Sequence, residues 1–210
     1  MKKLFLFDFD GVLIDSLEIY ERAVMQCLEK IRKPIVKNRA DFMDLFDDNF
    51  YEAIVKKGIA LEEYTNASRE IVAQIDYDQM EPFYDLIPVL YELKEDNLLV
   101  VISSNESGVI NKVLSRLRFD GCFKEILGSD FMYSKSEKIT HAMNRFHTER
   151  DSTYYVGDTA GDVKEAKIAG VNTVAVTWGW HSRERLEAAK PDHLIDRPEE
   201  LLILDTLPHK

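Results

Sequence analysis

The sequence predicts an α/β fold in which a doubly wound parallel sheet carries an inserted helical segment. Short, continuous apolar runs at 4–7 and 98–102 are typical of strands that are buried on both faces of a parallel sheet. From about residue 81 onward, such runs alternate with stretches of helical periodicity, as they do in βαβ units. Between about 17 and 80 the apolar residues recur at helical spacing, and we find no convincing strand there.

The order of these elements predicts a core that is interrupted once. The chain is expected to stay extended through 12–14 after Gly11, and Ser16 is expected to cap the first helix, at 17–31. Further helices are expected at 47–57, 61–75, 88–97, 106–117, 136–146, 161–168, 183–189 and the C-terminus. Strands are expected at 4–7, 98–102, 125–127, 153–156, 173–176 and 193–195. Residues 1–15 and 81–210 then form a Rossmann-like core, and residues 16–80 form a helical cap.

The composition excludes several classes of partner. With 38 acidic against 27 basic residues, the chain has a formal net charge of −11, which argues against nucleic-acid and anionic-membrane partners. No apolar run is long enough to cross a bilayer, and Asp8 and Asp10 interrupt the N-terminal run, so we expect a cytoplasmic protein without a signal peptide. Cys27 and Cys122 are expected to be reduced, buried thiols.

Small polar clusters follow several of the expected strands. Because parallel strands end at one edge of their sheet, these clusters are expected to converge although they are far apart in the sequence. They are Asp8 and Asp10; Ser103, Ser104 and Asn105; Lys135 and Lys138; and Asp158 and Asp162.

These residue types suit the chemistry of a phosphomonoester. Mg²⁺ prefers oxygen ligands that include one or two carboxylates, which Asp8 and Asp158 can supply. If the extended geometry persists, Asp8 and Asp10 lie side by side, one as nucleophile and the other as proton donor. Ser103 offers a hydroxyl and neighbouring backbone N–H groups for phosphoryl oxygens, and a lysine offers a compact cation. We expect Gly11, Ser104 and Asn105 to help bind the substrate.

The motifs resemble those of the haloacid dehalogenase-like (HAD) hydrolase superfamily, in the branch whose helical cap follows the first strand. Asp8-Phe9-Asp10-Gly11 matches the DxDG box, the strand ending at Ser103 matches the second motif, and Gly157–Asp162 matches GDxxxD. The segment YVGDTAGDVKEAKIAGVNTVAVTWGW is most similar to phosphoglycolate phosphatase and its relatives. The third motif is a single basic residue, and we favour Lys135 over Lys138 because it lies just before a helix.

The resemblance implies roles for these residues. Asp8 would be the nucleophile that becomes an aspartyl-phosphate, and Asp10 would be the general acid and base. Mg²⁺ would be held by the Asp8 carboxylate, the Asp10 backbone carbonyl and Asp158, with Asp162 supporting the metal or binding it directly. Dehalogenases of this superfamily lack the second acid of the first box, so Asp10 favours phosphate ester chemistry.

We therefore expect a Mg²⁺-dependent phosphatase that acts on a small, phosphoglycolate-like phosphorylated metabolite, as a monomer or homodimer. The alternatives are a phosphosugar mutase on the same core and a non-catalytic phosphate-binding module.

Other residues are expected to be structural. Five basic residues at 30–39 are expected to form a solvated turn rather than a substrate-steering patch. Trp178, Trp180 and the aromatic residues of the cap are expected to pack in the core, and His181 is given no role. These aromatic residues are Tyr20, Phe42, Phe46, Phe50, Tyr51 and Tyr64.

Overall fold

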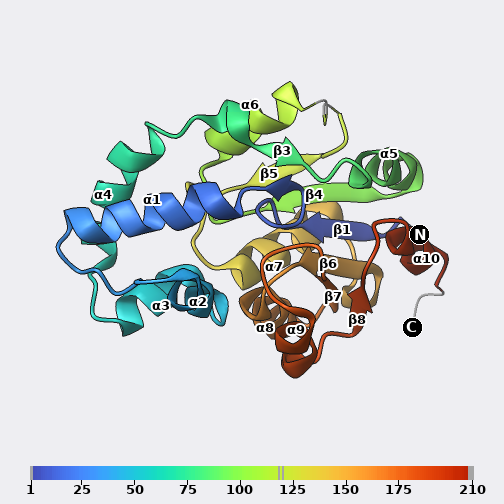
Figure 1. The fold of residues 1–210 in the computed structure, drawn as a ribbon. Coiled ribbons are helices and arrows are strands. Elements are labelled where there is room, and N and C mark those ends of the chain that lie inside the picture. The colour runs from blue at the N-terminus through green and yellow to red at the C-terminus, as the bar shows by residue number, and fades with distance from the viewer. Residues whose placement is uncertain (1, 118, 120, 208–210) are drawn as a thin grey trace.

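The apolar run Leu4–Phe7 forms strand β1, which lies inside a six-stranded parallel sheet (Figure 1). The structure is a computed structural model that describes residues 2–117, 119 and 121–207. Positions 1, 118, 120 and 208–210, which belong to the predicted core, lie outside the described residues. The remaining strands are β4 (Leu98–Ile102), β5 (Glu125–Leu127), β6 (Thr153–Gly157), β7 (Asn172–Val176) and β8 (His193–Ile195). The strand order is β5-β4-β1-β6-β7-β8, and β1 pairs in parallel with both β4 and β6.

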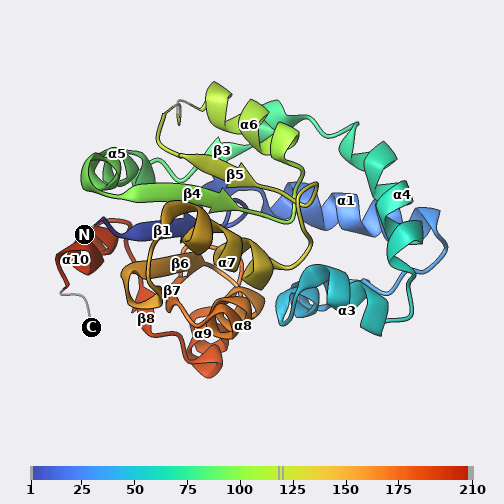
Figure 2. The same ribbon diagram turned by 180° about the vertical axis from the view of Figure 1, so that it is seen from behind.

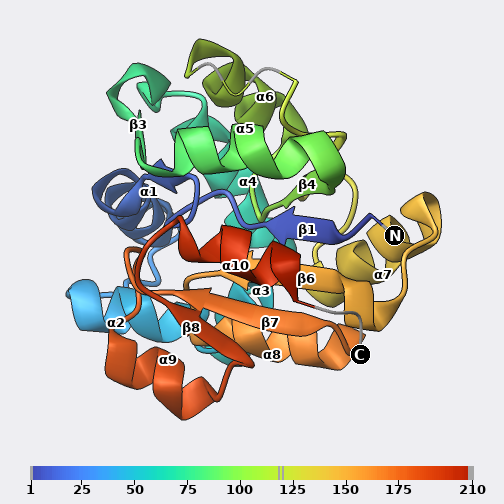
Figure 3. The ribbon, with the colours of Figure 1, turned by 90° about the vertical axis from the view of Figure 1, so that its right-hand side faces the viewer.

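Helices cover both faces of this sheet, which confirms the doubly wound α/β class. They are α5 (Leu86–Asp96), α6 (Ser107–Arg116), α7 (Lys135–Phe146), α8 (Ala160–Ala169), α9 (Arg183–Ala189) and α10 (Glu200–Thr206). Phe5 and Phe7 of β1 enter a core shared with α5, α6 and α10. Leu4 and Leu6 point to the opposite face and pack with residues of α7 and α8. Figure 3 shows α5 and α10 together on the first of these faces.

The sheet order creates a crevice beside β1. From β1 the chain continues to the adjacent β4 and then β5, before it crosses to β6 on the other side of β1. In open α/β sheets, ligands bind at the carboxyl ends of the strands where the strand order reverses in this way. The ends of β1 and β6 are therefore the expected position of the site.

A block that contains four α-helices lies between β1 and β4, where three helices were expected. It comprises α1 (Leu17–Lys30), α2 (Arg39–Met43), α3 (Phe50–Lys56) and α4 (Leu61–Val72). Figures 1 and 2 show the block beyond the end of the sheet to which β1 points. Helices α1 and α4 pack against each other, and buried residues of the block are continuous with the core of the sheet.

The two segments that connect the block to the sheet lie side by side. Strand β2 (Ile14–Asp15) pairs antiparallel with β3 (Glu81–Pro82), with Ile14 opposite Pro82 and Asp15 opposite Glu81. The chain thus leaves the sheet and returns to it at one place.

The expected extended path after Gly11 is wrong for residues 12 and 13, which form a turn, whereas Ile14 begins β2. Gly11 has φ +71°, its N–H donates to the Ile14 carbonyl at 2.9 Å, and the Leu13 N–H donates to the Phe9 carbonyl at 3.0 Å. These bonds close a tight turn that needs the left-handed conformation favoured by glycine. Ser16 occupies the N-cap position of α1 as expected, but its side chain makes no capping bond. Its hydroxyl donates instead to Asp10 Oδ1 at 2.7 Å.

Two helices of the block, α2 and α3, differ from the expected helices. Helix α3 begins at Phe50 rather than 47, because Asn49 caps it by accepting from the Tyr51 N–H at 3.0 Å. The short helix α2 was not predicted.

The expectations for the cysteines are confirmed: Cys27 and Cys122 are free and buried. Three of the basic side chains at 30–39 form ion pairs with acidic residues of the helical block: Lys30 with Glu70, Lys33 with Glu63, and Arg39 with Glu21. Among the described residues, no helix has the length and apolar character to cross a membrane.

Candidate active site

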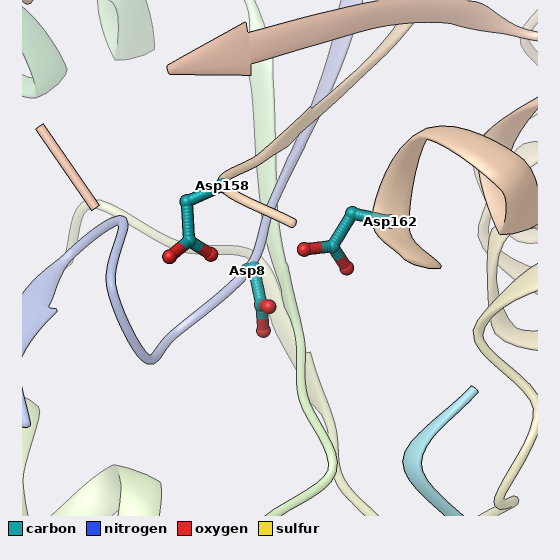
Figure 4. A group of neighbouring side chains, drawn as sticks. All are labelled: Asp8, Asp158 and Asp162. Carbon is teal, nitrogen blue, oxygen red and sulfur yellow. The ribbon is translucent and has the colours of Figure 1, made fainter. Parts of the chain in front are cut away.

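Three buried carboxylates converge at the crevice beside β1. Asp8 directly follows β1, Asp158 directly follows β6, and Asp162 lies in the first turn of α8. One oxygen from each carboxylate lies within 4.8 Å of the others. Figure 4 shows the three side chains directed toward a common space.

One lysine neutralises part of this charge. Lys135, the first residue of α7, places its Nζ 2.6 Å from Asp8 Oδ2 and 2.6 Å from Asp162 Oδ1. The ion pairs formed by the described residues include none for Asp158. Three carboxylates held by one ammonium leave an excess of negative charge in a buried place, which is costly unless another cation binds.

The pKa values reflect this imbalance. Burial raises the pKa of Asp8 to about 6, against the opposing charge of Lys135. Burial, followed by the charges of Asp162 and Asp8, raises the pKa of Asp158 well above its usual range. For Asp162, burial favours protonation, but the charge and hydrogen bond of Lys135 and the bonds from Thr159 hold its pKa below the usual value.

Asp162 uses all of its bonding capacity inside the fold. Its Oδ2 accepts from the Thr159 N–H at 3.1 Å and from the Thr159 hydroxyl at 2.7 Å, in a capping box that starts α8. Its Oδ1 accepts from Lys135 and from the Tyr155 hydroxyl at 3.2 Å. Asp162 is therefore well placed to fix the Lys135 ammonium beside Asp8.

Asp158 lies in a space that only glycine neighbours allow. A Cβ on Gly11 would lie 2.0 Å from Asp158 Oδ2, and a Cβ on Gly179 would lie 2.3 Å from Asp158 Cβ. The Trp180 N–H donates to Asp158 Oδ2 at 2.6 Å. Gly11, predicted to bind substrate, is thus placed against the Asp158 carboxylate.

Asp10 is held apart from the triad by neutral donors. Its Oδ1 accepts from the Ser16 hydroxyl at 2.7 Å, and its Oδ2 accepts from Asn105 Nδ2 at 2.6 Å. Burial, and then the charge of Asp8, raise the pKa of Asp10 to about 7. A carboxyl group with such a pKa can both give and take a proton near neutral pH.

Of the residues after β4, Ser104 lines the site, whereas Ser103 is buried behind it. Ser103 is fully buried; its hydroxyl accepts from the Asn105 N–H at 3.0 Å, and its carbonyl accepts from Lys138 Nζ at 2.6 Å. Ser104 lines a cavity of about 40 Å³ at the triad, together with Asp8, Asp10, Lys135, Asp158 and Asp162. The structure thus places Lys135 at the triad and Lys138 behind Ser103.

The sequence of the chain supports one family for this arrangement. The family model described as haloacid dehalogenase-like hydrolase matches residues 5–176. The chain belongs to this family.

Relatives of the hydrolase include named phosphatases. The phosphoglycolate phosphatase of Synechococcus elongatus is 27% identical over 201 residues, which cover 94% of each chain. The pyrophosphatase PpaX of Bacillus mycoides is 24% identical over 202 residues, again 94% of each chain. The crystal structure of a predicted phosphatase from Clostridium acetobutylicum has a TM-score of 0.84 at 22% identity, and covers 98% of this chain and 99% of that one. The predicted superfamily, fold and phosphatase class are confirmed.

A second cavity of the hydrolase adjoins the first. It has a volume of about 90 Å³ and lies between the helical block and the sheet. Asp10, Ser104, Phe46, Phe50 and Trp180 line both cavities, and Asn105 lines the second. For Phe46, Phe50 and Trp180, packing in the core was favoured over a position in the pocket. Their position after a strand end (Trp180) or near a helix start (Phe46 and Phe50) is too common a pattern to have identified them.

Sequence reasoning also missed residues that join the helical block to the hydrolase core. The buried His181 accepts from the Ala160 N–H through Nδ1 at 3.0 Å, and its Nε2 lies 3.1 Å from the Met43 carbonyl. Asn49 Nδ2 donates to Glu165 at 2.5 Å. The Asn49 cap was detectable as a helix start, but its second partner lies more than a hundred positions away.

Proposed function

We propose that this protein is a Mg²⁺-dependent phosphatase that hydrolyses a small phosphomonoester through an aspartyl-phosphate on Asp8. The observation that carries the proposal is the buried group of Asp8, Asp158 and Asp162 with Lys135 as its cation, at the crevice beside β1. The phosphatase relatives support the reaction class.

The donor set suits a magnesium ion. Carboxylate oxygens are the protein ligands that Mg²⁺ takes, and the excess negative charge at Asp158 calls for a second cation beside Lys135. We propose that Asp8 and Asp158 hold the ion with the Asp10 backbone carbonyl, and that Asp162 supports this shell. When bound, the ion neutralises charge on the phosphoryl oxygens.

Asp8 is prepared to attack phosphorus. Its Oδ1 accepts from the Phe9 N–H at 2.7 Å and its Oδ2 from Lys135, so that the carboxylate is fixed in orientation. In the first step Asp8 forms a bond to phosphorus as the bond to the alcohol oxygen breaks, and Asp10 gives its proton to that oxygen. In the second step Asp10 takes a proton from water, which attacks the aspartyl-phosphate and releases inorganic phosphate. Lys135 and Ser104, which line the cavity, would contact the phosphoryl oxygens.

We further propose that residues 16–80 act as a cap that encloses the site. A Cβ on Gly161, at the start of α8, would lie 2.4 Å from the Asp48 carbonyl oxygen, so the helical block rests directly on the core beside the triad. Enclosure of this kind excludes bulk water from the reacting groups.

The test is hydrolysis of 4-nitrophenyl phosphate, with and without Mg²⁺. We expect turnover that requires the metal, is lost in Asp8→Asn, and falls by about a hundredfold or more in Asp10→Asn, which cannot transfer the proton. Turnover that survives Asp8→Asn or chelation of the metal would contradict the mechanism. Interconversion of hexose phosphates without release of phosphate would indicate a mutase instead.

A further inference from the structure

The second cavity lies on the side of the site where the leaving alcohol must be. The two cavities meet at Asp10, whose carboxyl group is the proposed proton donor to the alcohol oxygen. The triad and Lys135 line only the first cavity, which therefore receives the phosphoryl group. The shape and chemistry of the second cavity then decide which alcohols the enzyme accepts.

The walls of this cavity are aromatic and apolar. Trp180 meets Phe46 edge to face with centroids 4.9 Å apart, Phe46 stacks on Phe50 at 5.3 Å, and Phe50 meets Tyr64 at 5.5 Å. Val24, from α1, lies in the same lining. Such surfaces favour an apolar or aromatic body over a hydrated one.

No cation faces this cavity. Among the described residues that line it, Asp10 is the only charged one. The adjoining groove, of about 530 Å³, does contain Arg69, but it also contains Glu106 and Asp130, which offset that charge. A carboxylate placed within two carbon atoms of the phosphate would therefore lie near Asp10 without a positive partner, which is strongly unfavourable in a buried place.

Two buried polar groups of the lining lack partners. The Tyr20 hydroxyl and Trp180 Nε1 make no hydrogen bond with the part of the chain that the structure describes. Burial, and then the charge of Asp10, raise the pKa of the Tyr20 hydroxyl well above its usual value, while Asn105 lies close enough to oppose this shift. An unsatisfied buried donor costs about 1–3 kcal/mol, and a ligand oxygen that accepts from it recovers this energy.

We propose, resting on the phosphatase function above, that the leaving group is an uncharged alcohol with an apolar or aromatic body and an oxygen that accepts from Tyr20 or Trp180. The phosphate esters of short carboxylate-bearing alcohols, phosphoglycolate among them, are then poor substrates. This differs from the activity for which some of the relatives are named.

The first test compares 2-hydroxyethyl phosphate with phosphoglycolate. The two esters differ in that one carries a CH₂OH group where the other carries a carboxylate. We expect kcat/KM for 2-hydroxyethyl phosphate to be higher by about tenfold or more, the cost of an unpaired buried charge. Equal values, or a preference for phosphoglycolate, would overturn the proposal. Failure of every ester, including 4-nitrophenyl phosphate, would instead contradict the phosphatase function.

The second test places a cation in the cavity. Val72 is a half-buried lining residue at the end of α4, so Val72→Arg adds a positive charge there, and Val72→Gln adds polarity alone. We expect Val72→Arg to shift the kcat/KM ratio toward phosphoglycolate by about tenfold, and Val72→Gln to leave the ratio near its original value. A matching shift in Val72→Gln, or none in Val72→Arg when both variants fold, would contradict a role for charge.

The third test addresses the unpartnered donors. Tyr20→Phe and Trp180→Phe each keep an aromatic ring and remove one polar atom. In the variant that removes the donor to the alcohol oxygen, we expect a smaller preference for 2-hydroxyethyl phosphate over ethyl phosphate, by about fivefold for one hydrogen bond. A preference unchanged in both variants would show that neither group receives the oxygen of the alcohol.

Discussion

At the scale of single residues, the site requires glycine, which has no side chain, at positions that lie against Asp158. Gly11 combines a left-handed backbone with close contact to Asp158, whereas Gly58 has φ +82° and no atom within 4 Å of a built Cβ. The pair separates two costs that usually occur together: backbone strain, which both positions share, and steric overlap, which only Gly11 has.

We predict that Gly11→Ala destabilises the protein by more than Gly58→Ala. Strain alone costs about 1–2 kcal/mol, and at Gly11 the added methyl group must also displace Asp158. Thermal unfolding of both variants measures the stability, and titration with Mg²⁺ measures binding to the displaced carboxylate. Equal destabilisation together with unchanged Mg²⁺ affinity would show that Asp158 adapts without cost.

The lowered pKa of the buried Lys138 predicts that the stability of the protein depends on pH. Burial, and then the charge of Lys135, lower its pKa from 10.5 to about 7. Between these values the unfolded chain holds the proton and the folded chain does not, so stability rises with pH, by at most about 1.4 kcal/mol per pH unit. Below pH 7 both states are protonated and the slope vanishes.

The measurement compares the wild-type protein with Lys138→Met by chemical denaturation from pH 6 to pH 10. The difference in unfolding free energy should change in favour of the wild type as the pH rises above about 7. A difference that stays constant over this range would mean that Lys138 keeps its ordinary pKa in the folded protein.

At the scale of elements, α8 links secondary structure to chemistry. The capping box of Thr159 and Asp162 both starts the helix and holds the carboxylate that bonds Lys135. A defect in the helix cap therefore reaches the proposed nucleophile through two side chains.

We predict that Thr159→Ala lowers stability by about 1 kcal/mol and also lowers activity, whereas Thr159→Ser preserves both. Loss of the hydroxyl leaves Asp162 Oδ2 with fewer donors and loosens the position of Lys135. Denaturation and kcat on 4-nitrophenyl phosphate are the two readouts. If Thr159→Ala lost stability alone, the cap and the site would be independent.

The elements differ in how far the sequence predicts them. Strands β1 and β4 are apolar over their whole length, and β6 and β7 contain shorter apolar runs, because both faces of the sheet are buried. These strands were therefore identifiable, and with them the convergence of Asp8 and Asp158. The turn after Gly11 was missed, because its hydrogen bonds from residues 11–14 leave no periodic pattern. The cavity beside Asp10 could not be predicted, since its walls join residues that are far apart in the sequence, such as Phe46 and Trp180.

At the scale of the whole molecule, partly exposed ion pairs join the helical block to the core in addition to the buried apolar contacts. Arg185 of α9 pairs with Asp44 at 2.8 Å and Asp47 at 2.6 Å, and Lys164 of α8 pairs with Asp48 at 2.8 Å. These groups are partly exposed, so each pair contributes little, about 1 kcal/mol or less. Weak contacts of this kind are compatible with the proposed cap, which would open to exchange ligands.

We predict that Arg185→Ala raises KM by about two- to fivefold and that the effect shrinks at high salt, because the lost contacts are electrostatic. Arg183→Ala is the matched control: it lies on the same helix but pairs with Glu187 and Asp196, which belong to the core. Steady-state kinetics at two ionic strengths distinguish the variants. Equal effects on KM from both variants would mean that the change comes from α9 itself and not from its ion pairs with the helical block.

The pairing of β2 with β3 makes the helical block, in topological terms, the loop of a very long hairpin. The entropy of closing a loop grows only with the logarithm of its length, so the ladder between Ile14 and Pro82 tolerates many lengths of connection. Insertions of other sizes at this point are therefore expected to leave the pairing of Ile14 with Pro82 and of Asp15 with Glu81 unchanged.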